Sequence, residues 1–322
     1  MKYLTIGTLW KHENDYALDF IRYHRAVGVE HFVIFNNAFT DDNSLEELLK
    51  DESDVEVIRF IPDARQLHQV AWGELIKYNQ GKTKWLALID ADQCLVPVQT
   101  DDVRDILKNY EDFASLQLNW KAFGSSGQDK KLPGSVYERF QYCAPADCDY
   151  SLVTQFICQP DRTLPVKVKE PHYPLLPEGE LMVNTNKEVI SDTKVVAMNP
   201  ATPLSFNTPA LHDVLWVAHY TNKSKEEWLF KNNRGRADII GEKMPTTQFD
   251  EYELQANKVK ETRAFELWKK AQIITLSERS ADLGYWQAVW ESSSAGIGLS
   301  SEGLQELEKE VKSLLNAVLG AK

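Results

Sequence analysis

The first 96 residues alternate between strand-like and helix-like patterns, and this alternation restricts the fold more than any other feature. The strand-like apolar runs are Tyr3–Leu9, His31–Phe35, Val55–Phe60 and Trp85–Ile89. The amphipathic helical patterns between them are Tyr16–Val27, Ser44–Lys50 and Leu67–Tyr78. Strands and helices that alternate through short links are typical of a parallel, right-handed α/β sheet. The sequence therefore predicts an α/β fold of the nucleotide-binding kind in this region.

The fourth predicted strand is followed by two aspartates, Asp90 and Asp92, within the stretch Lys84–Val96. An unbroken apolar run such as Trp85–Ile89 indicates a strand that is buried on both faces. Ligands of open α/β sheets bind beyond the carboxyl ends of the strands, so both carboxylates are expected at an active-site rim. Two acids in that position can hold a divalent cation together with phosphate groups. The alternative is that they cap the next turn.

The alternation stops after residue 96. Between 97 and 220, strand signals such as Ser115–Trp120 and Leu215–His219 lie among prolines and glycines, and helical signals are limited to 101–111 and 150–158. This half is expected to form strands and long loops that cover one side of the sheet.

From Ser224 the sequence becomes helical, beginning with a Ser-x-x-Glu capping box. Further helices are predicted over Tyr252–Lys270 and Ser280–Glu291. The last helix has heptad spacing at Leu304, Leu307, Val311, Leu314 and Val318. Because Leu315 and Leu319 widen this apolar face, packing onto the protein's own body is favoured, and a homodimer through a coiled coil is the alternative.

Composition excludes some partners. The 36 basic and 48 acidic residues give a formal net charge of −12, which argues against non-specific nucleic-acid binding. The four cysteines lack zinc-site spacing and are expected to be reduced thiols, with a Cys143–Cys148 bridge as the alternative. The N-terminus lacks a signal-peptide pattern, and no run approaches the ~18 apolar residues of a membrane span. A soluble, cytoplasmic protein is expected, with peripheral membrane association left open.

Motifs of several other enzyme classes are absent from the sequence. There is no GxGxxG after the first strand, no GxxxxGK and no HExxH, which weakens dehydrogenase, P-loop and zinc-protease interpretations. Instead, Glu13 follows the first strand, Asn36 and Asn37 end the second, and the aspartate pair follows the fourth. Carboxyl ends of parallel strands share one edge of a sheet, so these residues are expected to converge there. Convergence favours a functional role for the aspartates over turn capping.

The runs HENDYALDFIRYHRAVGVEHFVIFNN and KWLALIDADQCLVP resemble the GT-A glycosyltransferases of the family-92 and related family-2-like group. The likeness continues through NWKAFGSSG, ERF, KVKEPH and WVAHYTNKSKEEWLFKNNRGRAD, and covers about residues 3–238. It implies a GT-A-like domain over 1–240, which has a mostly parallel nucleotide-binding sheet flanked by helices. Its nucleotide-sugar half is expected at 1–96 and its acceptor half at 97–240. A helical extension over 241–322 follows.

The resemblance also implies which residues bind a nucleotide-sugar donor. Glu13 and Asn37 are implied to lie by its base and ribose, with Gln69 on the helix nearby. The basic residues implied near the diphosphate are Lys223, Lys231 and Arg234. Without the resemblance, these basic residues are equally explained as a solvated helix face.

The resemblance implies a divalent metal, Mn²⁺ or Mg²⁺, held by Asp90, Asp92 and His219. Asp92 is implied to bond the metal, and Asp90 the ribose or a metal-bound water. A divalent ion and basic residues suit the reaction because cleavage of a nucleotide sugar develops charge on the diphosphate. A core histidine with satisfied hydrogen bonds is the alternative for His219.

The sequence departs from the family at two points. Gln93 and Cys94 follow the aspartate pair where the family commonly has Glu-Phe, and Asn36-Asn37 replaces the Asp-Asn of many relatives. These departures leave a degenerate or noncatalytic interaction protein as an alternative function. A nucleotidyltransferase is a second alternative, although the first strand is not followed by the expected glycine-rich basic loop.

Several carboxylates are candidates for the catalytic base. An inverting transferase needs a carboxylate that takes the acceptor hydroxyl proton. The resemblance favours Asp149, because this superfamily often places its base at a helix N-terminus and Asp149 precedes a predicted helix; an ordinary N-cap is the rival interpretation. The other candidates are Asp147, Glu170 and Asp213. The expected function is metal-dependent transfer of a sugar, plausibly from a UDP-sugar, to a glycan, surface-polysaccharide or lipid-linked saccharide acceptor.

Overall fold

The computed structural model describes residues 1–38, 42–63, 67–166, 172–190, 195–199, 202–205, 209–235, 245 and 247–275. Residues Met1–Phe265 form one compact unit, and Glu266 begins a second. The predictions for Ser280–Glu291, the heptad face at 304–318 and Glu170 lie outside the described residues. The division into domains at residue 240 stays a prediction.

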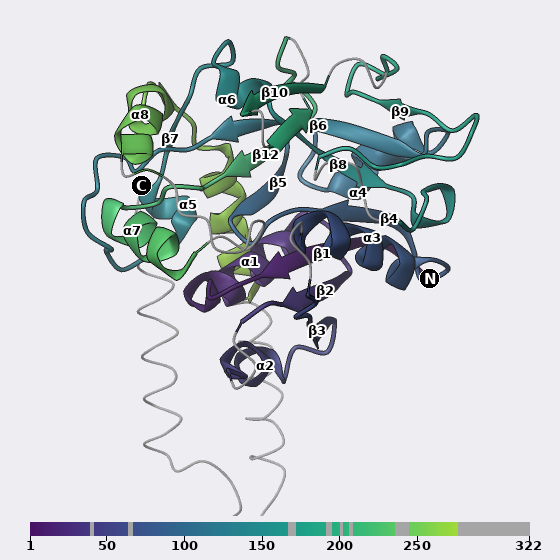
Figure 1. The fold of residues 1–322 in the computed structure, drawn as a ribbon, viewed down its shortest axis with the longest axis horizontal. Helices are drawn as coiled ribbons and strands as arrows, with labels where there is room; N and C mark the ends of the chain where they lie inside the picture. The colour runs from purple at the N-terminus through teal and green to yellow at the C-terminus, as the bar shows by residue number, and fades with distance from the viewer. Residues whose placement is uncertain are drawn as a thin grey trace, which may run out of the picture. The chain divides into compact units, whose positions relative to one another are not determined.

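The N-terminal half is the predicted parallel α/β sheet. Its strands are β1 (Lys2–Trp10), β2 (His31–Asn36), β3 (Val55–Arg59) and β4 (Thr83–Leu88), in the order β3-β2-β1-β4 and all parallel. Its helices are α1 (Ala17–Ala26), α2 (Ser44–Leu49) and α3 (Leu67–Asn79). Helix α3 packs on β1 and β4, and α2 lies at the β3 edge (Figure 1). The strand–helix alternation predicted from the sequence is confirmed.

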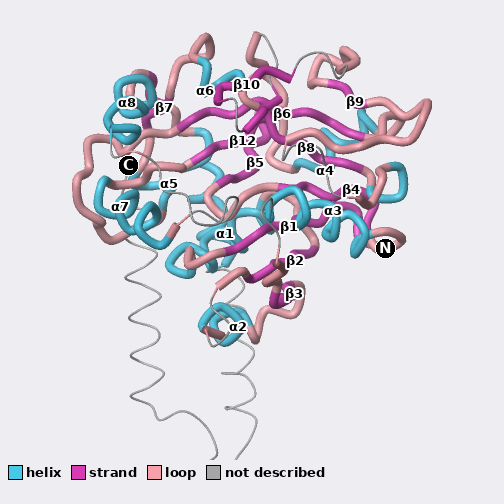
Figure 2. Tube along the Cα trace, viewed as in Figure 1, coloured by secondary structure: helices cyan, strands magenta, loops and turns pink. Residues whose placement is uncertain are grey.

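The sheet continues beyond β4 with mixed strand directions (Figure 2). β8 (Thr154–Cys158) is antiparallel to both β4 and β6 (Ser115–Ala122). β12 (Leu215–His219) runs parallel to β6 and antiparallel to β5 (Gln93–Pro97). The short strand β9 (Met182–Val183) also pairs with β6.

Two predicted helices are wrong in extent. The helical signal at 150–158 is a single turn, α6 (Asp149–Leu152), followed by β8, because a short buried strand cannot be told from a helix by periodicity. The predicted helix Tyr252–Lys270 ends at Ala256 as α8 (Thr247–Ala256) and resumes at residue 263. Between them β13 (Val259–Lys260) pairs with β7 (Tyr142–Cys143), so these backbone groups bond to a strand instead of a helix.

The remaining elements are short. They are η1 (Asn14–Tyr16), α4 (Val103–Leu107), η2 (Lys108–Tyr110), α5 (Val136–Arg139), η3 (Pro160–Arg162), β10 (Val195–Asn199), β11 (Thr202–Ser205) and α7 (Lys225–Arg234). The four cysteines are free, as expected. Within the described ranges, no helix is both long and apolar enough to cross a membrane.

The core under α3 fixes the strand ends that carry the site. Leu88 and Phe156 on the sheet pack in one apolar cluster with Trp72 and Leu75 of α3, all fully buried. The sheet cannot shift against α3 without opening this cluster, so the position of the β4 end is set by core packing.

We expect Leu88→Ala to lower the free energy of unfolding by about 2–5 kcal/mol, because it removes buried methyl groups and leaves a cavity. Leu88 is 0% exposed, whereas Leu48 of α2 is 40% exposed and provides the matched control, Leu48→Ala. Urea unfolding of both variants measures the difference. Equal midpoints for the two variants would contradict the assignment of Leu88 to the core.

Candidate functional site

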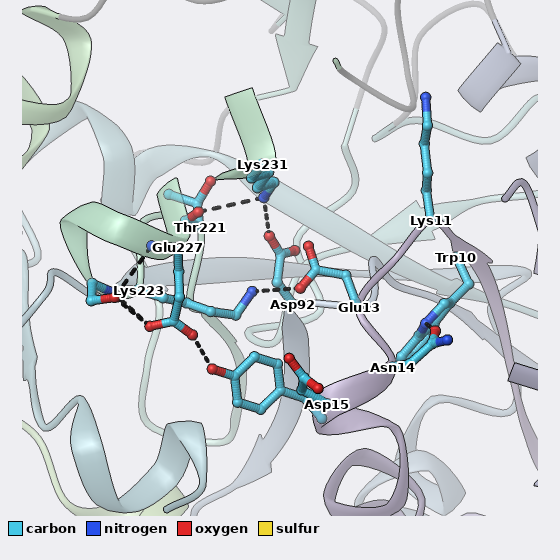
Figure 3. Close-up of polar contacts among 12 residues, drawn as sticks. Trp10, Lys11, Glu13, Asn14, Asp15, Asp92, Thr221, Lys223, Glu227 and Lys231 are labelled. Atoms are coloured by element: carbon cyan, nitrogen blue, oxygen red, sulfur yellow. Dashed lines mark hydrogen bonds and ion pairs between the residues drawn. The ribbon is translucent and has the colours of Figure 1, made fainter. Parts of the chain in front are cut away.

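Three strand ends and one helix supply the charged residues of the candidate site (Figure 3). Glu13 follows β1, Asp92 follows β4, and His219 is the last residue of β12. Helix α7 begins with the predicted capping box, in which Ser224 and Glu227 bond each other's backbone N–H groups. The cap sets the start of α7, and its later turns carry the basic residues that reach the strand ends.

Asp92 is a buried carboxylate between a lysine and a histidine. Its side chain is 7% exposed, with Lys231 Nζ 2.5 Å from Oδ2 and His219 Nε2 3.5 Å from Oδ1. Burial by itself raises the pKa of Asp92, but the charges of Lys231 and His219 outweigh it and hold this pKa well below its usual range. Asp92 is therefore ionised at neutral pH.

Glu13 is the second carboxylate that α7 and its preceding loop engage. Lys223 Nζ lies 2.9 Å from Glu13 Oε2, and Arg234 lies 2.5 Å from Oε1. Arg234 also donates to the carbonyl of Lys11. In this cluster Lys231, Lys223 and Arg234 face the carboxylates of Asp92 and Glu13, so three basic groups meet at the strand ends.

Two residues of this cluster have strained backbones. His12 and Lys223 have φ angles of 51° and 54°, in the left-handed region that side chains other than glycine rarely adopt. Such conformations cost about 1–3 kcal/mol each and persist where the surroundings impose them. At Lys223 the imposed conformation accompanies the buried ion pair with Glu13.

Asp90 has different partners from Asp92. Its Oδ1 lies 2.9 Å from His68 Nε2, and its Oδ2 accepts from the side-chain amide of Gln93 at 3.0 Å. The side chain of Asp90 is 27% exposed, so it can still reach a ligand. The two aspartates of the motif therefore point to separate partners.

The aromatic ring of Trp120 packs between the rings of His219 and His172. The Trp120 ring centroid is 4.2 Å from that of His219 and 5.2 Å from that of His172. Burial lowers the pKa of His172 to about 3, with a further contribution from His68. His172 is thus neutral at physiological pH.

Phe123 and Trp216 are 1% exposed and belong to the core, whereas Trp120 is half-buried.

A buried polar network supports the base of α7. Glu227 pairs with Arg139 at 2.7 Å and accepts from the hydroxyl of Tyr16, and both charged side chains are at most 10% exposed. Burial would raise the pKa of Glu227, but hydrogen bonds from Arg139, Ser224 and Tyr16 lower it to about 2. The network holds α7 against η1 and α5.

A cavity of about 400 Å³ opens between α7 and the loop after β1. Its lining includes Tyr16, Phe230, Glu13, Lys223 and Lys231. Phe230 is 63% exposed, so its ring is available to a ligand. This volume falls in the usual range of small-molecule sites.

Three residues predicted from the family resemblance lie outside this cluster. Asn37 uses its side-chain amide to donate to the carbonyl of Phe60 at 2.8 Å. Gln69 is buried on α3, at 8% exposure. Asp149 is exposed in the first turn of α6, and no side-chain hydrogen bond or ion pair in the described part of the chain links it to Asp92. The roles proposed for these three residues stay predictions.

Two residues of the site were not identified from the sequence. His68 lies on α3 next to the predicted Gln69 and contacts Asp90. The sequence could have indicated His68, because a histidine at the start of a helix that follows a strand lies close to the carboxyl edge of the sheet. Phe230 gave no such signal, since an aromatic residue on an amphipathic helix is usually a core residue.

Asp92 and His219 are the described residues of the predicted metal site that lie together. Among the described residues, no group of three or more histidine, cysteine, aspartate or glutamate side chains is arranged to hold a metal. Asp92 and His219 face each other at 3.5 Å; a carboxylate suits Mg²⁺ or Mn²⁺, whereas an imidazole is more often a ligand of softer metals, and Lys231 already bonds Asp92. Magnesium commonly uses one or two protein ligands and completes its shell with phosphate and water. Asp90 is engaged by other partners and is not part of this pair.

The sequence matches the model of Glycosyltransferase family 92 over residues 6–247, which includes every residue of the cluster described above. The chain belongs to glycosyltransferase family 92. The resemblance inferred from the sequence motifs is thereby confirmed, and the GT-A-like α/β fold class agrees with the observed sheet.

Relatives match only part of the chain. A glycosyltransferase family 92 protein of Oryza sativa subsp. japonica is 24% identical over 186 residues, which is 56% of this chain but only 31% of that protein. The crystal structure of S. aureus TarS 1–349 in complex with UDP has 12% identity and a TM-score of 0.32, covering 50% of this chain and 47% of that one. That of 4-diphosphocytidyl-2C-methyl-D-erythritol synthase has 12% identity and a TM-score of 0.32, covering 60% and 94%. These scores are too low to support an assignment of activity.

Proposed function

We propose that this family 92 protein transfers a sugar from a nucleoside diphosphate sugar, with UDP as the nucleotide, to a glycan or lipid-linked saccharide acceptor. The single observation that carries the proposal is the cluster formed by α7 and the strand ends. Lys231 and Lys223 meet Asp92 and Glu13 beside a cavity of about 400 Å³. Lysine side chains next to a cavity of this size suit the phosphate groups of a diphosphate.

The residues have distinct roles in this proposal. Asp92 and His219 would hold a divalent ion. Such an ion stabilises the charge that develops on the diphosphate leaving group. Lys231, Lys223 and Arg234 add fixed positive charge at the same place, so the leaving group is stabilised without reorganisation of water.

Acceptor activation requires a base. Asp149 is proposed as the base that takes the acceptor hydroxyl proton, although it is exposed on α6. The acceptor, a cytoplasmic location, association with a membrane surface and a homodimer through the C-terminal helix likewise remain predictions.

A panel of nucleotide sugars tests the function. The purified chain is incubated with each donor and Mn²⁺, and release of nucleoside diphosphate is measured with and without saccharide acceptors. Release from one UDP-sugar supports the proposal. Silence with every donor, together with no binding of UDP, would favour a noncatalytic interaction protein, for which the replacement of the family's acid by Gln93 is the sequence argument.

Phe230 provides a separate test of the cavity. We expect Phe230→Ala to weaken UDP binding about tenfold, because base stacking on an aromatic ring contributes ~1–3 kcal/mol. Stability should not change, since Phe230 is 63% exposed. The neighbouring Leu229, 40% exposed and outside the cavity lining, gives the matched control Leu229→Ala. Isothermal titration calorimetry with UDP that finds equal affinities would place the nucleotide elsewhere.

A further inference from the structure

We infer that Gln93 is a positioning residue that holds the Asp90 carboxylate in one orientation for a hydroxyl group of the ligand. Gln93 stands where the family commonly has an acid, which made it a sign of degeneracy at the sequence level. Its contacts indicate a specific role instead. The inference rests on the proposed function, because it concerns the donor site.

The Gln93 side chain is 1% exposed, and both ends of its amide form hydrogen bonds. Its Oε1 accepts the backbone N–H of Asp90 at 3.1 Å and the side-chain amide of Gln155 at 3.1 Å. Its Nε2 donates to Asp90 Oδ2 at 3.0 Å. Gln93 therefore bonds both the backbone and the carboxylate of the same aspartate.

The direction of the Gln93 amide is determined by its neighbours. Two N–H donors meet Oε1, so the opposite orientation of the amide would place donor against donor. The backbone N–H of Asp90 is a donor that cannot be reversed, and Asp90 Oδ2 is an acceptor, so Asp90 by itself fixes this direction. Nε2 must therefore face Asp90, and a glutamate at position 93 could not supply this donor.

His68 lies beside the other oxygen of the same carboxylate. Its Nε2 lies 2.9 Å from Asp90 Oδ1, and the ring packs on Trp72 with centroids 4.3 Å apart. Gln93 hydrogen-bonds Oδ2, and His68 lies at ion-pair distance from Oδ1, while the Asp90 side chain remains 27% exposed. A carboxylate with remaining acceptor capacity recognises hydroxyl groups. Asp90 therefore accepts from a hydroxyl of the ribose or the transferred sugar, and Asp92 with His219 serves the cation.

Three variants test this assignment: Gln93→Glu, Asp90→Asn and the double exchange of both. Gln93→Glu sets two acceptors against each other, so the ligand that carries the hydroxyl group bound by Asp90 should bind about tenfold more weakly, as expected when a hydrogen bond to a charged group is lost. That ligand is UDP if the hydroxyl belongs to the ribose, and the UDP-sugar if it belongs to the sugar. The factor by which Mn²⁺ strengthens UDP binding should stay the same. The double exchange restores a donor–acceptor pair, so it should recover the melting temperature of the wild type but not its affinity for the ligand bound by Asp90.

Ligand analogues identify the hydroxyl. If Asp90 reads the ribose, the wild type prefers UDP to 2′-deoxy-UDP or 3′-deoxy-UDP, and Gln93→Glu loses that preference. If Asp90 reads the sugar, Gln93→Glu weakens only the binding of UDP-sugars. Gln80, exposed at the end of α3, gives the control Gln80→Glu. Should Gln93→Glu fail to fold, Gln155→Leu provides a second test. It removes one hydrogen-bond donor to Gln93 Oε1 and should weaken binding of the same ligand about threefold.

The outcomes separate the inference from the proposed function. A wild type that binds no nucleoside diphosphate overturns both. A wild type that binds UDP, with Gln93→Glu equal to it for UDP and for UDP-sugars, overturns the inference alone. Recovery of affinity for the same ligand together with the melting temperature in the double exchange would also overturn it, because Gln93 would then have only a structural role.

Discussion

Asp92→Asn should lower the release of nucleoside diphosphate by about 10²–10³-fold, the loss typical when one electrostatic stabiliser of a transition state is removed. The exchange preserves the shape of the side chain but removes the charge that Lys231 and His219 face. We also expect the effect of Mn²⁺ on UDP binding to disappear. Donor turnover and titration with UDP, with and without Mn²⁺, measure the two effects.

The control for Asp92→Asn is the same exchange at an exposed position. Asp105 of α4 is 55% exposed and pairs with Lys108 three residues on, so Asp105→Asn should leave turnover unchanged. Thermal unfolding of Asp92→Asn must accompany the assay, because the variant leaves Lys231 without its countercharge. A folded Asp92→Asn protein whose UDP binding still responds to Mn²⁺ would rule out Asp92 as the metal ligand.

Glu227→Gln should lower the free energy of unfolding by about 3–5 kcal/mol, because it leaves the guanidinium of Arg139 buried without a countercharge. The Arg139 side chain is 4% exposed and its partner Glu227 is 10% exposed. The adjacent Glu226 is 50% exposed, so Glu226→Gln is a control that should change stability little. Urea unfolding of both variants near neutral pH gives the comparison.

The same pair predicts a pH dependence. The folded-state pKa of Glu227 is about 2, against an ordinary value of 4.5, so its stabilising effect is complete above about pH 4.5. It is lost as the pH falls from there toward 2, and amounts to about 3 kcal/mol in all. The gap in stability between wild type and Glu227→Gln should therefore narrow between pH 5 and pH 3. A gap that is constant over this range would show that the pKa is not lowered.

Much of the fold was predictable because local patterns and core packing agree. The runs Tyr3–Leu9 and His31–Phe35 are apolar strands, and both lie in the parallel sheet as β1 and β2. Thr154–Cys158 was misassigned as helical because a buried central strand has no alternation of apolar and polar residues. The break after Ala256 was missed because the pairing of β13 with β7 involves residues more than one hundred positions apart.

The candidate site was predictable in membership but not in pairing. By itself the sequence determined that Asp90 and Asp92 follow a buried strand, and that Lys231 and Arg234 lie on a capped helix. Only the tertiary structure decided that Asp92 meets Lys231 and His219 while Asp90 meets His68 and Gln93. The physical reason is that the turn after β4 directs the two side chains differently, and their partners come from segments joined only by packing of the sheet and α7. Such pairings depend on distances between elements, which no local pattern of residues encodes.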